Sequence, residues 1–389
     1  MPFSKALGAA CDLSSMSGFH QLTVSDVRKE TDDAVCITLD VPNGLKEAFR
    51  FAHGQYLTLQ ADIDGSEVRR SYSICSDIDE ANLCVAIKQV NGGVFSAYAN
   101  NLLRAGDTLA VSPPAGNFTS ELNPASAKTY LCIAAGSGIT PVISIVKSIL
   151  AHEPNSEVTL LFGNQRVASI MFREALEQLK NRYMSRFQLV HILSQEKRDT
   201  EILNGRINNK KGAELSQHLL DLAQFDEFFL CGPESMISEV SRGLRGFGAD
   251  EACIHYELFG ASADDAARVV EKHRERARRL GDQMCLVTVI FDGRGTVLEL
   301  DADGENILDR AIDAGLDLPF ACKGGVCATC KAKVADGEVE MDMNHALDAH
   351  ELDGGYVLTC QAHPLSAKVV RFRRSAITTT PAGSSIFLS

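Results

Sequence analysis

The spacing of apolar and polar residues changes along the chain and divides it into segments. Residues 20 to about 120 alternate with a period of two, in short runs such as Val35, Ile37, Leu39 and Val41, and Gly, Asn, Asp and Pro clusters separate these runs. This pattern is typical of an antiparallel β-barrel. From about residue 128, apolar runs such as "TYLCIAA" and "EVTLLFG" alternate with helical stretches at 140–151, 168–182, 213–223 and 234–246. That alternation predicts a parallel sheet covered by helices.

The C-terminal third has a different character. Residues 261 to 283 are rich in charge and alanine, which predicts a solvated helical linker and, as the less favoured alternative, a basic docking site for a partner. Beyond it, "MCLVTVIFDGRGTVLEL" predicts a hairpin around Asp-Gly, followed by the helix "ENILDRAIDAG" and a cysteine loop. We therefore expect a multi-domain chain with these parts: a β-barrel at 18–122, an α/β parallel-sheet domain at 123–260, a linker at 261–283 and a small α+β domain at 284–375.

The composition excludes several classes of function. The chain has 389 residues, of which 45% are hydrophobic, so it can bury two or three cores. A formal net charge of −13 argues against nucleic-acid binding, which needs basic surfaces. The uncharged stretch 129–146 contains "AGSGITP", which favours a strand, a turn and a helix start over a membrane span. The N-terminus lacks an apolar signal-peptide core, so we expect a cytoplasmic protein without a membrane partner.

The cysteine loop "CKGGVCATC" carries the most specific chemical signal. Its cysteines are separated by four and then two residues, and a distant fourth follows in "VLTCQAH"; the set is Cys322, Cys327, Cys330 and Cys360. This is the plant-type [2Fe–2S] spacing, in which four thiolates surround a compact diiron core. The glycines let backbone N–H groups turn toward the sulfurs. A structural zinc site is the alternative, but it usually pairs two short motifs, and only one C-x-x-C is present.

A Rieske centre would need histidine ligands beside the cysteines. His345, His350 and His363 lie nearby without that arrangement, so we interpret them as ordinary surface or loop histidines. The segment 284–375 resembles the plant-type ferredoxins in "CKGGVCATC" and "GGYVLTCQA", and this resemblance implies a β-grasp fold.

Two motifs in the barrel segment suit a phosphate-bearing cofactor. In "RRSYSI" the strand alternation directs Arg70 and Tyr72 to one face and Ser73 to the other. Arg70 can hold a phosphate and Tyr72 can lie against an aromatic ring, although a surface Arg and a barrel-face Tyr are the more common explanation. "NGGVFS" is a glycine turn that enters a helix and can place backbone N–H groups and one hydroxyl around a pyrophosphate; the residues concerned are Gly93, Val94 and Ser96.

The second segment contains a glycine loop in the context that phosphate binding requires. "AAGSGITP" follows a predicted strand and opens a helix, with Pro141 in its first turn. Its candidate nucleotide-binding residues are Gly136, Gly138, Thr140 and Pro141.

Together these motifs resemble the ferredoxin–NADP reductase superfamily over residues 20 to 260. The resemblance implies that Arg70, Tyr72 and Ser73 contact the flavin and that "PPAGNF" lies near its adenine side. It also places Cys231, Gly232 and Pro233, the "CGP" motif, near the nicotinamide. It implies Tyr72, Ser73 and Cys231 as the residues closest to the redox chemistry. "PPAGNF" is closer to FAD-binding members, which favours FAD over FMN.

The choice between nicotinamide cofactors depends on the residues after the second strand. A carboxylate there suits the ribose hydroxyl of NADH, and an arginine suits the 2′-phosphate of NADPH. After "EVTLLFG" no carboxylate precedes Glu174, so Arg166, Ser169 and Arg173 are candidate 2′-phosphate contacts and NADH is the less favoured cofactor. The alternative is that both arginines are solvated residues at a helix start.

The domain order resembles oxygenase reductases, most of all the reductase subunits of bacterial phenylacetyl-CoA epoxidases. It implies electron transfer from NADPH through FAD and the [2Fe–2S] cluster to a separate, multi-subunit di-iron oxygenase, since this chain has no Glu-x-x-His pair of its own. Reductases of steroid hydroxylases, aromatic-ring oxygenases or acyl desaturases keep the mechanism and change the partner. A non-catalytic iron–sulfur redox sensor is the alternative of another class.

The acidic residues near the cysteine loop are candidates for partner docking. They are Asp342, Asp348, Glu351 and Asp353, and a solvated acidic loop is the alternative interpretation.

Overall fold

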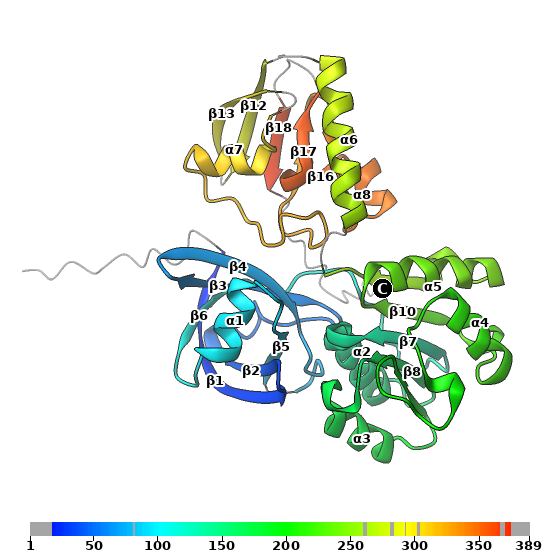
Figure 1. Ribbon diagram of the computed structural model, residues 1–389. Coiled ribbons are helices and arrows are strands. Elements are labelled where there is room, and N and C mark those ends of the chain that lie inside the picture. The colour runs from blue at the N-terminus through cyan, green and yellow to red at the C-terminus, as the bar shows by residue number, and fades with distance from the viewer. Residues whose placement is uncertain are drawn as a thin grey trace, which may run out of the picture. The chain divides into compact units, whose positions relative to one another are not determined.

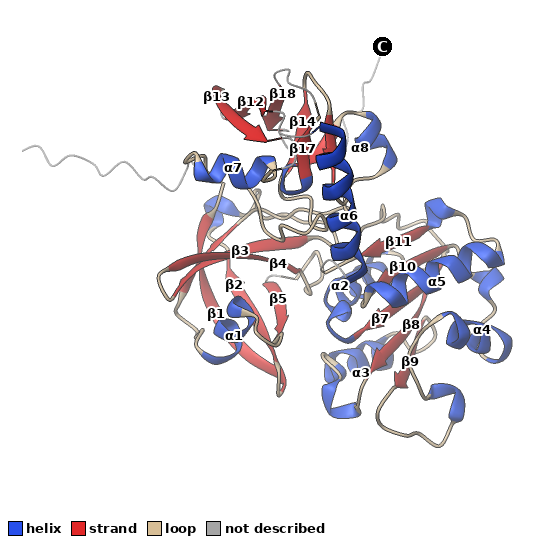
Figure 2. Ribbon diagram, turned by 45° about the horizontal axis from the view of Figure 1, so that its top comes forward, coloured by secondary structure: helices blue, strands red, loops and turns tan. Residues whose placement is uncertain are grey.

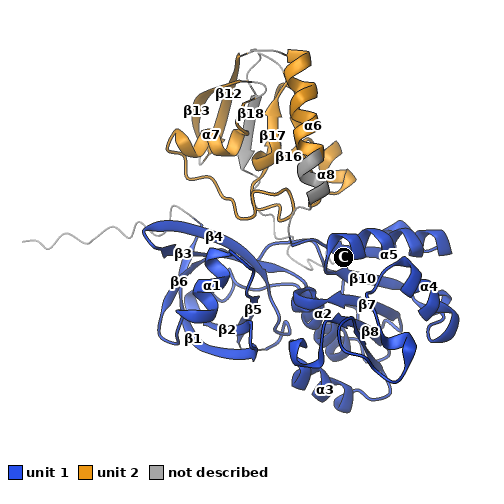
Figure 3. Ribbon diagram, in the orientation of Figure 1, with its two compact units in different colours: residues 1–259 blue, residues 260–389 orange. Residues whose placement is uncertain are grey.

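The computed structural model describes residues 18–80, 82–259, 263–280, 284–291, 293–301, 304–365 and 370–374. The chain divides into two compact units, residues 1–259 and 260–389 (Figure 3). The N-terminal stretch on which the signal-peptide prediction depends lies outside the described residues. Within the described ranges, no cysteine forms a disulfide and no helix is long and apolar enough to cross a membrane.

The first part of unit 1 is an antiparallel barrel. Its strand order is β4-β3-β6-β1-β2-β5, and an isolated antiparallel bridge between Ile74 and Val85 connects the two edges. Helix α1 lies beside this sheet (Figure 1). The elements are β1 (His20–Thr31), β2 (Ala34–Asp40), β3 (Tyr56–Ile63), β4 (Ser66–Ser73), β5 (Leu83–Lys88), α1 (Val94–Asn101) and β6 (Thr108–Val111). The period-two alternation therefore predicted the architecture correctly, because inward residues such as Leu22, Val24 and Ile37 are fully buried.

The second part of unit 1 is a five-stranded parallel sheet in the order β11-β10-β7-β8-β9, with helices packed against it (Figure 2). The prediction of a parallel sheet is confirmed. Its strands are β7 (Thr129–Ala135), β8 (Glu157–Asn164), β9 (Phe187–Leu193), β10 (Glu227–Cys231) and β11 (Ile254–Glu257). Its α-helices are α2 (Ile139–His152), α3 (Arg173–Arg182), α4 (Asn209–His218) and α5 (Glu234–Phe247).

Two of these helices begin elsewhere than the sequence pattern predicts. α3 begins at Arg173 because Phe172 adopts a left-handed conformation (φ 56°) after the short 3-10 turn η4 (Val167–Ser169). The Phe172 N–H donates to the Glu30 carboxylate of β1 at 3.1 Å, which fixes this break. α4 begins at Asn209 because the Asn208 side chain caps it by accepting from the Lys211 N–H at 2.8 Å.

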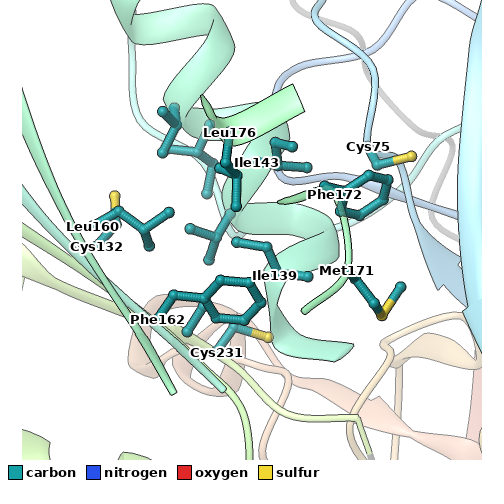
Figure 4. Packing of buried hydrophobic residues seen from close by; sticks show 14 of the residues in the cluster. Cys75, Cys132, Ile139, Ile143, Leu160, Phe162, Met171, Phe172, Leu176 and Cys231 are labelled. Atoms are coloured by element: carbon teal, nitrogen blue, oxygen red, sulfur yellow. The ribbon is translucent and has the colours of Figure 1, made fainter. Parts of the chain in front are cut away.

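The barrel and the parallel-sheet domain share one hydrophobic cluster. It combines residues of α2, β7 and β8 with barrel residues such as Ala34, Cys36 and Cys75. Figure 4 shows part of it, with Cys75 from the barrel side and Ile139, Ile143 and Cys231 from the nucleotide side. Hydrogen bonds reinforce the contact: the Ser144 hydroxyl donates to the Ser76 carbonyl at 2.7 Å. The two parts of unit 1 are therefore packed as one body.

Unit 2 is an α+β domain with a five-stranded mixed sheet in the order β13-β12-β18-β14-β16 and a β15-β17 pair. Its strands are β12 (Met284–Phe291), β13 (Arg294–Asp301), β14 (Lys331–Val334), β15 (Val339–Met341), β16 (Tyr356–Leu358), β17 (Ala362–Pro364) and β18 (Val370–Arg374). Its helices are α6 (Ala263–Leu280), α7 (Ile307–Asp313), α8 (Ala349–Asp353) and the 3-10 turn η8 (Thr359–Gln361). The other short 3-10 turns of the chain are η2 (Asn43–Leu45), η3 (Gly136–Gly138), η5 (Glu201–Leu203), η6 (Leu222–Gln224) and η7 (Glu251–Cys253).

The helix α6 corrects the prediction of a solvated linker. It is helical, as expected, but its Arg276 side chain is fully buried and pairs with Asp342 at 2.8 Å and Glu340 at 3.4 Å. The charges of this segment therefore serve partly to attach it to the ferredoxin-like domain. The outward residues Arg274 and Arg279 keep the exposure expected of a linker.

Candidate redox sites

The four predicted ligand cysteines come together in unit 2. Cys322, Cys327 and Cys330 lie in the loop between α7 and β14, and Cys360 lies in η8. The Thr359 N–H and hydroxyl both donate to the Cys330 carbonyl, at 3.1 and 3.0 Å, so the distant cysteine is held against the loop. Cys327, Cys330 and Cys360 are buried, and Cys322 is half-buried.

The protonation of these thiols shows how closely they lie. Contacts with Cys327 and Cys360 lower the pKa of Cys322, and contact with Cys360 lowers the pKa of Cys330. The same contacts raise the pKa values of Cys327 and Cys360, because a thiol beside a thiolate donates its proton while two adjacent thiolates repel. Four thiolates at this spacing need a cationic centre between them, which fits an iron–sulfur cluster.

The backbone of the loop supports this assignment. The Gly324 N–H donates to the Cys322 sulfur at 3.3 Å, as predicted from the glycine pair. Lys323 and Ala328 adopt left-handed conformations, with φ of 51° and 50°, although neither is glycine. Such backbone strain persists only where the surrounding structure imposes it, as at a ligand-binding loop.

Gln361 is a residue that the sequence reasoning missed. Its side-chain amide donates to the Lys323 carbonyl at 3.0 Å and to the Cys360 carbonyl at 2.9 Å, and lies 3.7 Å from the Cys360 sulfur. It therefore joins the cysteine loop to η8. The only signal in the sequence was its place beside Cys360.

The barrel strand β4 places the predicted flavin residues as its alternation requires. Arg70 is exposed, Tyr72 is half-buried with its ring 5.6 Å from that of Phe95, and Ser73 is buried. Burial raises the pKa of the Tyr72 phenol, so it stays protonated. An exposed guanidinium and a half-buried aromatic ring on one strand suit a ligand with a phosphate and a flat ring system.

Ser73 reaches across to the nucleotide domain. Its hydroxyl donates to the Glu257 carboxyl at 2.9 Å, at the end of β11. Burial raises the pKa of Glu257 to about 8, and the Ser73 hydrogen bond offsets this only in part. Glu257 is therefore largely protonated near neutral pH. It was not predicted, because its partner lies 184 residues away in the sequence.

Cys231 is the neighbour of Glu257 in the parallel register of β10 and β11. Its thiol is completely buried in the shared cluster, and burial raises its pKa well above the usual value. The Cβ of any larger residue at Gly138 would lie 2.1 Å from the Cys231 carbonyl oxygen, so only glycine fits there. The glycine loop and the "CGP" loop are thus in direct contact.

The glycine loop has the predicted strand–turn–helix form. It follows β7 as the turn η3, with Gly136 in a left-handed conformation (φ 55°), and opens α2 with Pro141 in the first turn. The Thr140 hydroxyl donates to the Ser137 carbonyl at 3.0 Å and so stabilises the turn itself. Gly232 and Pro233 follow the neighbouring strand β10, and Pro233 is the residue directly before α5. Both loops therefore meet at the carboxyl ends of adjacent parallel strands, where open α/β sheets bind ligands.

The turn before α1 differs in one detail from the expectation. Gly93 occupies the N-cap and Val94 is exposed, but the Ser96 hydroxyl is buried; it accepts from the Val90 N–H and donates to the Gly93 carbonyl, both at 3.1 Å. The hydroxyl is used inside the turn. Backbone N–H groups remain the candidate phosphate contacts.

The candidate 2′-phosphate residues lie beside a groove after β8 and β9. The groove is lined by Arg173, His191, Lys197, Arg198 and Thr200, among others, while Arg166 and Ser169 form the adjacent turn η4. Burial, then the charges of Arg198 and Arg173, lower the pKa of His191 to about 4.

The Ser169 hydroxyl bonds to the Arg166 backbone within the turn. Acidic side chains also approach this groove. One of them, Glu177, pairs with Arg173 at 3.1 Å. Glu196 accepts from the Val167 N–H at 2.8 Å. Glu196 follows the third strand of this sheet, β9, so the residues after the second strand do not reveal it.

The predictions of an acidic docking surface and of surface or loop histidines are corrected at two residues, Asp342 and His363. Asp342 is buried and bonds to His363 at 2.9 Å, and His363 is itself buried, so it is not a surface histidine. Glu351 pairs with Lys331 at 2.7 Å and forms a capping box with Asp348. The others are as expected: His345 is half-buried, and Asp348, His350 and Asp353 are exposed.

Comparison with known proteins agrees with the three-part architecture. Family models match the oxidoreductase FAD-binding domain over residues 21–120, the oxidoreductase NAD-binding domain over 132–242 and the 2Fe-2S iron-sulfur cluster binding domain over 289–365. The chain is 45% identical over 355 residues to a subunit of 1,2-phenylacetyl-CoA epoxidase of Escherichia coli (strain K12), covering 91% of this chain and 98% of that protein. The chain belongs to the reductase components of oxygenase systems. It is an oxidoreductase with FAD, pyridine-nucleotide and 2Fe-2S domains.

Other relatives of this reductase share the same layout. It is 32% identical to the ferredoxin reductase component of 3-ketosteroid-9-alpha-monooxygenase of Rhodococcus rhodochrous, over 89% of this chain and 94% of that protein. Among solved structures, phthalate dioxygenase reductase matches with a TM-score of 0.54 and 22% identity, over 91% of this chain and 98% of that one. At this identity the structural match supports the fold alone.

Proposed function

We propose that this reductase takes electrons from NADPH and delivers them to a separate, multi-subunit di-iron oxygenase that acts on phenylacetyl-CoA. The observation that carries the proposal is the 45% identity to a component of 1,2-phenylacetyl-CoA epoxidase over 98% of that protein's length. When bound, the flavin supplies the conversion from a two-electron hydride donor to single electrons, and the cluster supplies one-electron transfer.

The residues of unit 1 supply binding and orientation for this chemistry. Arg70 is proposed to hold the cofactor phosphate, and Tyr72 to pack against the flavin ring. Ser73 is proposed to orient Glu257, to which it donates at 2.9 Å. With its raised pKa, Glu257 can hold a proton beside the redox site near neutral pH. Cys231 stays a proposed nicotinamide neighbour, because Gly138 brings the glycine loop against it.

The acceptor can be identified by reconstitution. The purified reductase is mixed with NADPH and either the oxygenase subunits of a phenylacetyl-CoA epoxidase or the oxygenase component of a 3-ketosteroid 9α-hydroxylase, and product formation is measured. We expect epoxide formation with the first partner and at most slow turnover with the second. Preferential support of the steroid oxygenase, a relative's partner at 32% identity, would overturn the proposed substrate.

The preference for NADPH is proposed from the cations around the groove after β8 and β9. Arg166→Glu and Arg198→Glu each place a carboxylate where a 2′-phosphate would bind and should raise the KM for NADPH at least 10-fold more than that for NADH. Arg50→Glu, at an exposed barrel position, is the matched control and should change neither. Equal effects on the two cofactors would contradict the assignment.

A third experiment separates the flavin half from the cluster half. Cys360→Ser replaces one thiolate by a poorer iron ligand and should abolish the cluster and electron delivery to the oxygenase. Reduction of ferricyanide by NADPH should survive, because the described hydrophobic clusters of unit 1 are built from residues of unit 1. Parallel loss of both activities would mean that the cluster domain is needed to build the flavin site.

A further inference from the structure

A second group of potential metal ligands lies in unit 2, apart from the four cysteines. His273 of α6, Asp342 after β15 and His363 of β17 place one ligand atom each within 4.8 Å of one another. The His363 and His273 Nε2 atoms lie 2.9 and 3.0 Å from the same Asp342 oxygen, Oδ2. Figure 1 shows α6 running alongside β17, which brings these distant residues together.

The geometry around Asp342 resembles a preformed metal site. Its other oxygen, Oδ1, accepts from the Arg276 guanidinium at 2.8 Å. In metal sites a carboxylate commonly binds the ion with one oxygen while a neighbouring side chain holds the other. Tetrahedral zinc with bonds of about 2.0–2.1 Å separates its ligand atoms by about 3.3 Å, only slightly more than the two distances observed here.

The contacts of the Asp342 carboxyl are also suitable. It is buried, with the Arg276 guanidinium at Oδ1 and the two imidazoles at Oδ2. The Nδ1 atom of His363 is buried without a hydrogen-bond partner in the described part of the chain. The Nε2 atom, 2.9 Å from Asp342 Oδ2, is the ring nitrogen through which His363 would bind an ion.

The surroundings hold the ligands and leave one side open. Glu340 also faces Arg276, so the guanidinium is neutralised by two carboxylates. Lys272 donates to the backbone carbonyls of residues 341 and 342, at 2.9 Å each, and fixes the segment that carries Asp342. The His273 side chain is about one-third exposed, so a water molecule can reach a fourth position.

We propose that His273, Asp342 and His363 bind one zinc ion that attaches α6 to the cluster-binding domain. Two imidazoles and one carboxylate suit zinc, whereas magnesium and calcium prefer sites made of oxygen alone. The Asp342 N–H donates to the Gln361 carbonyl at 2.8 Å, next to Cys360. The zinc therefore stabilises the strand that follows the fourth cluster ligand and ties it to α6, without taking part in electron transfer.

The test is metal analysis of the full-length holoprotein, purified without chelators, equilibrated with one equivalent of Zn²⁺ and desalted. We expect one zinc and two irons per chain. His273→Ala and His363→Ala should each lower zinc at least 10-fold and leave iron unchanged. His350→Ala, an exposed histidine of the same domain, is the control and should keep both metals.

X-ray absorption at the zinc edge separates this site from misloading of the cysteines, and neither the flavin nor the iron interferes with it. Nitrogen and oxygen neighbours at about 2.0–2.1 Å support the proposal, and a sulfur shell at about 2.3 Å overturns it. Wild-type protein that retains no zinc overturns it as well. If the alanine variants fail to fold, His273→Gln keeps a hydrogen-bond donor on α6 but is a poor zinc ligand; unchanged zinc in that variant would also overturn the proposal.

Discussion

Glu257, at the junction of the barrel and the nucleotide domain, and Asp342, beneath α6, are both enclosed carboxyl groups with opposite ionisation. Burial raises the pKa of Glu257 to about 8. Asp342 is also buried, yet its pKa falls to about 2. Burial alone therefore does not decide the direction of the pKa shift. The hydrogen-bonding partners do.

The difference in partners corresponds to the difference in role. Glu257 accepts a hydrogen bond from the Ser73 hydroxyl, an uncharged donor, at a junction where cofactors are proposed to bind. Asp342 has contacts from Arg276, His273 and His363, which all belong to its own unit. A carboxyl group with a weak, neutral partner can exchange protons near neutral pH, whereas a fully paired carboxylate is fixed in its charged state.

The largest expected effect comes from removing the ion pairs that Arg276 makes with Asp342 and Glu340. Arg276→Ala removes the buried guanidinium that pairs with Asp342 and Glu340, so the free energy of unfolding of unit 2 should fall by about 3–5 kcal/mol. Arg279→Ala is the matched control, because Arg279 contacts the same Glu340 at 3.3 Å but is exposed, and it should cost under about 1 kcal/mol. Urea unfolding followed by cluster absorbance measures both. Similar losses in the two variants would mean that burial does not strengthen the pair.

The next effect comes from distorting the junction. Gly138→Ala puts a Cβ within 2.1 Å of the Cys231 carbonyl oxygen, and backbone lies on both sides of the contact, so the two loops must separate. We expect a loss of about 1–3 kcal/mol and at least a 10-fold rise in the KM for the nicotinamide cofactor. Gly212→Ala, which meets no atom within 4 Å, is the control for thermal unfolding and kinetics. Unchanged cofactor affinity in Gly138→Ala would show that this contact does not shape the site.

The pH dependence of stability tests Glu257 directly. Its folded pKa of about 8 lies above the ordinary value of 4.5, so the folded state holds the extra proton between these pH values. Stability from this group is complete below about pH 4.5 and is lost as the pH rises toward 8, with a slope of up to about 1.4 kcal/mol per pH unit. Glu257→Gln should flatten that slope in thermal unfolding of the holoprotein between pH 5 and 9. An identical slope in the variant would place the proton elsewhere.

The smallest expected effect comes from changing Ser73, the hydrogen-bond partner of Glu257. Ser73→Ala removes the hydrogen bond that lowers the Glu257 pKa, so the alkaline limb of the pH profile for NADPH-dependent ferricyanide reduction should move upward, by about one pH unit or less. Ser71→Ala, two residues earlier, is the control because Ser71 contacts Thr58 and not Glu257. A downward shift in Ser73→Ala would contradict the proposed role of the hydroxyl.

The features that the sequence predicted are those that depend on local order. The cysteine spacing identified four cysteines that come together in unit 2. The switch from period two to alternating strands and helices predicted the barrel and the parallel sheet. The strand–turn–helix form of the glycine loop was likewise readable, because Gly136 and Pro141 have defined backbone preferences.

The features that it could not supply depend on distant partners. Ser73 meets Glu257, and Phe172 meets Glu30, across separations of 184 and 142 residues, and no local pattern encodes either pair. The charges of α6 predicted solvent exposure, but Arg276 finds its partners 64 and 66 residues away. Ser96 was assigned to a ligand because its residue type fits, whereas the turn itself uses the hydroxyl.

The hydrophobic cluster shared by the barrel and the parallel-sheet domain determines where this chain can be cut and recombined. A division near residue 122 would separate members of this cluster, such as Cys75 of the barrel and Ile143 of α2, and expose part of it to water. A division between residue 259 and α6 leaves that cluster whole and keeps Arg276 with its carboxylates. The barrel and the nucleotide domain should therefore be transferred together when the chain is joined to another acceptor. Helix α6 should stay with the cysteine-containing domain, whose carboxylates it pairs with.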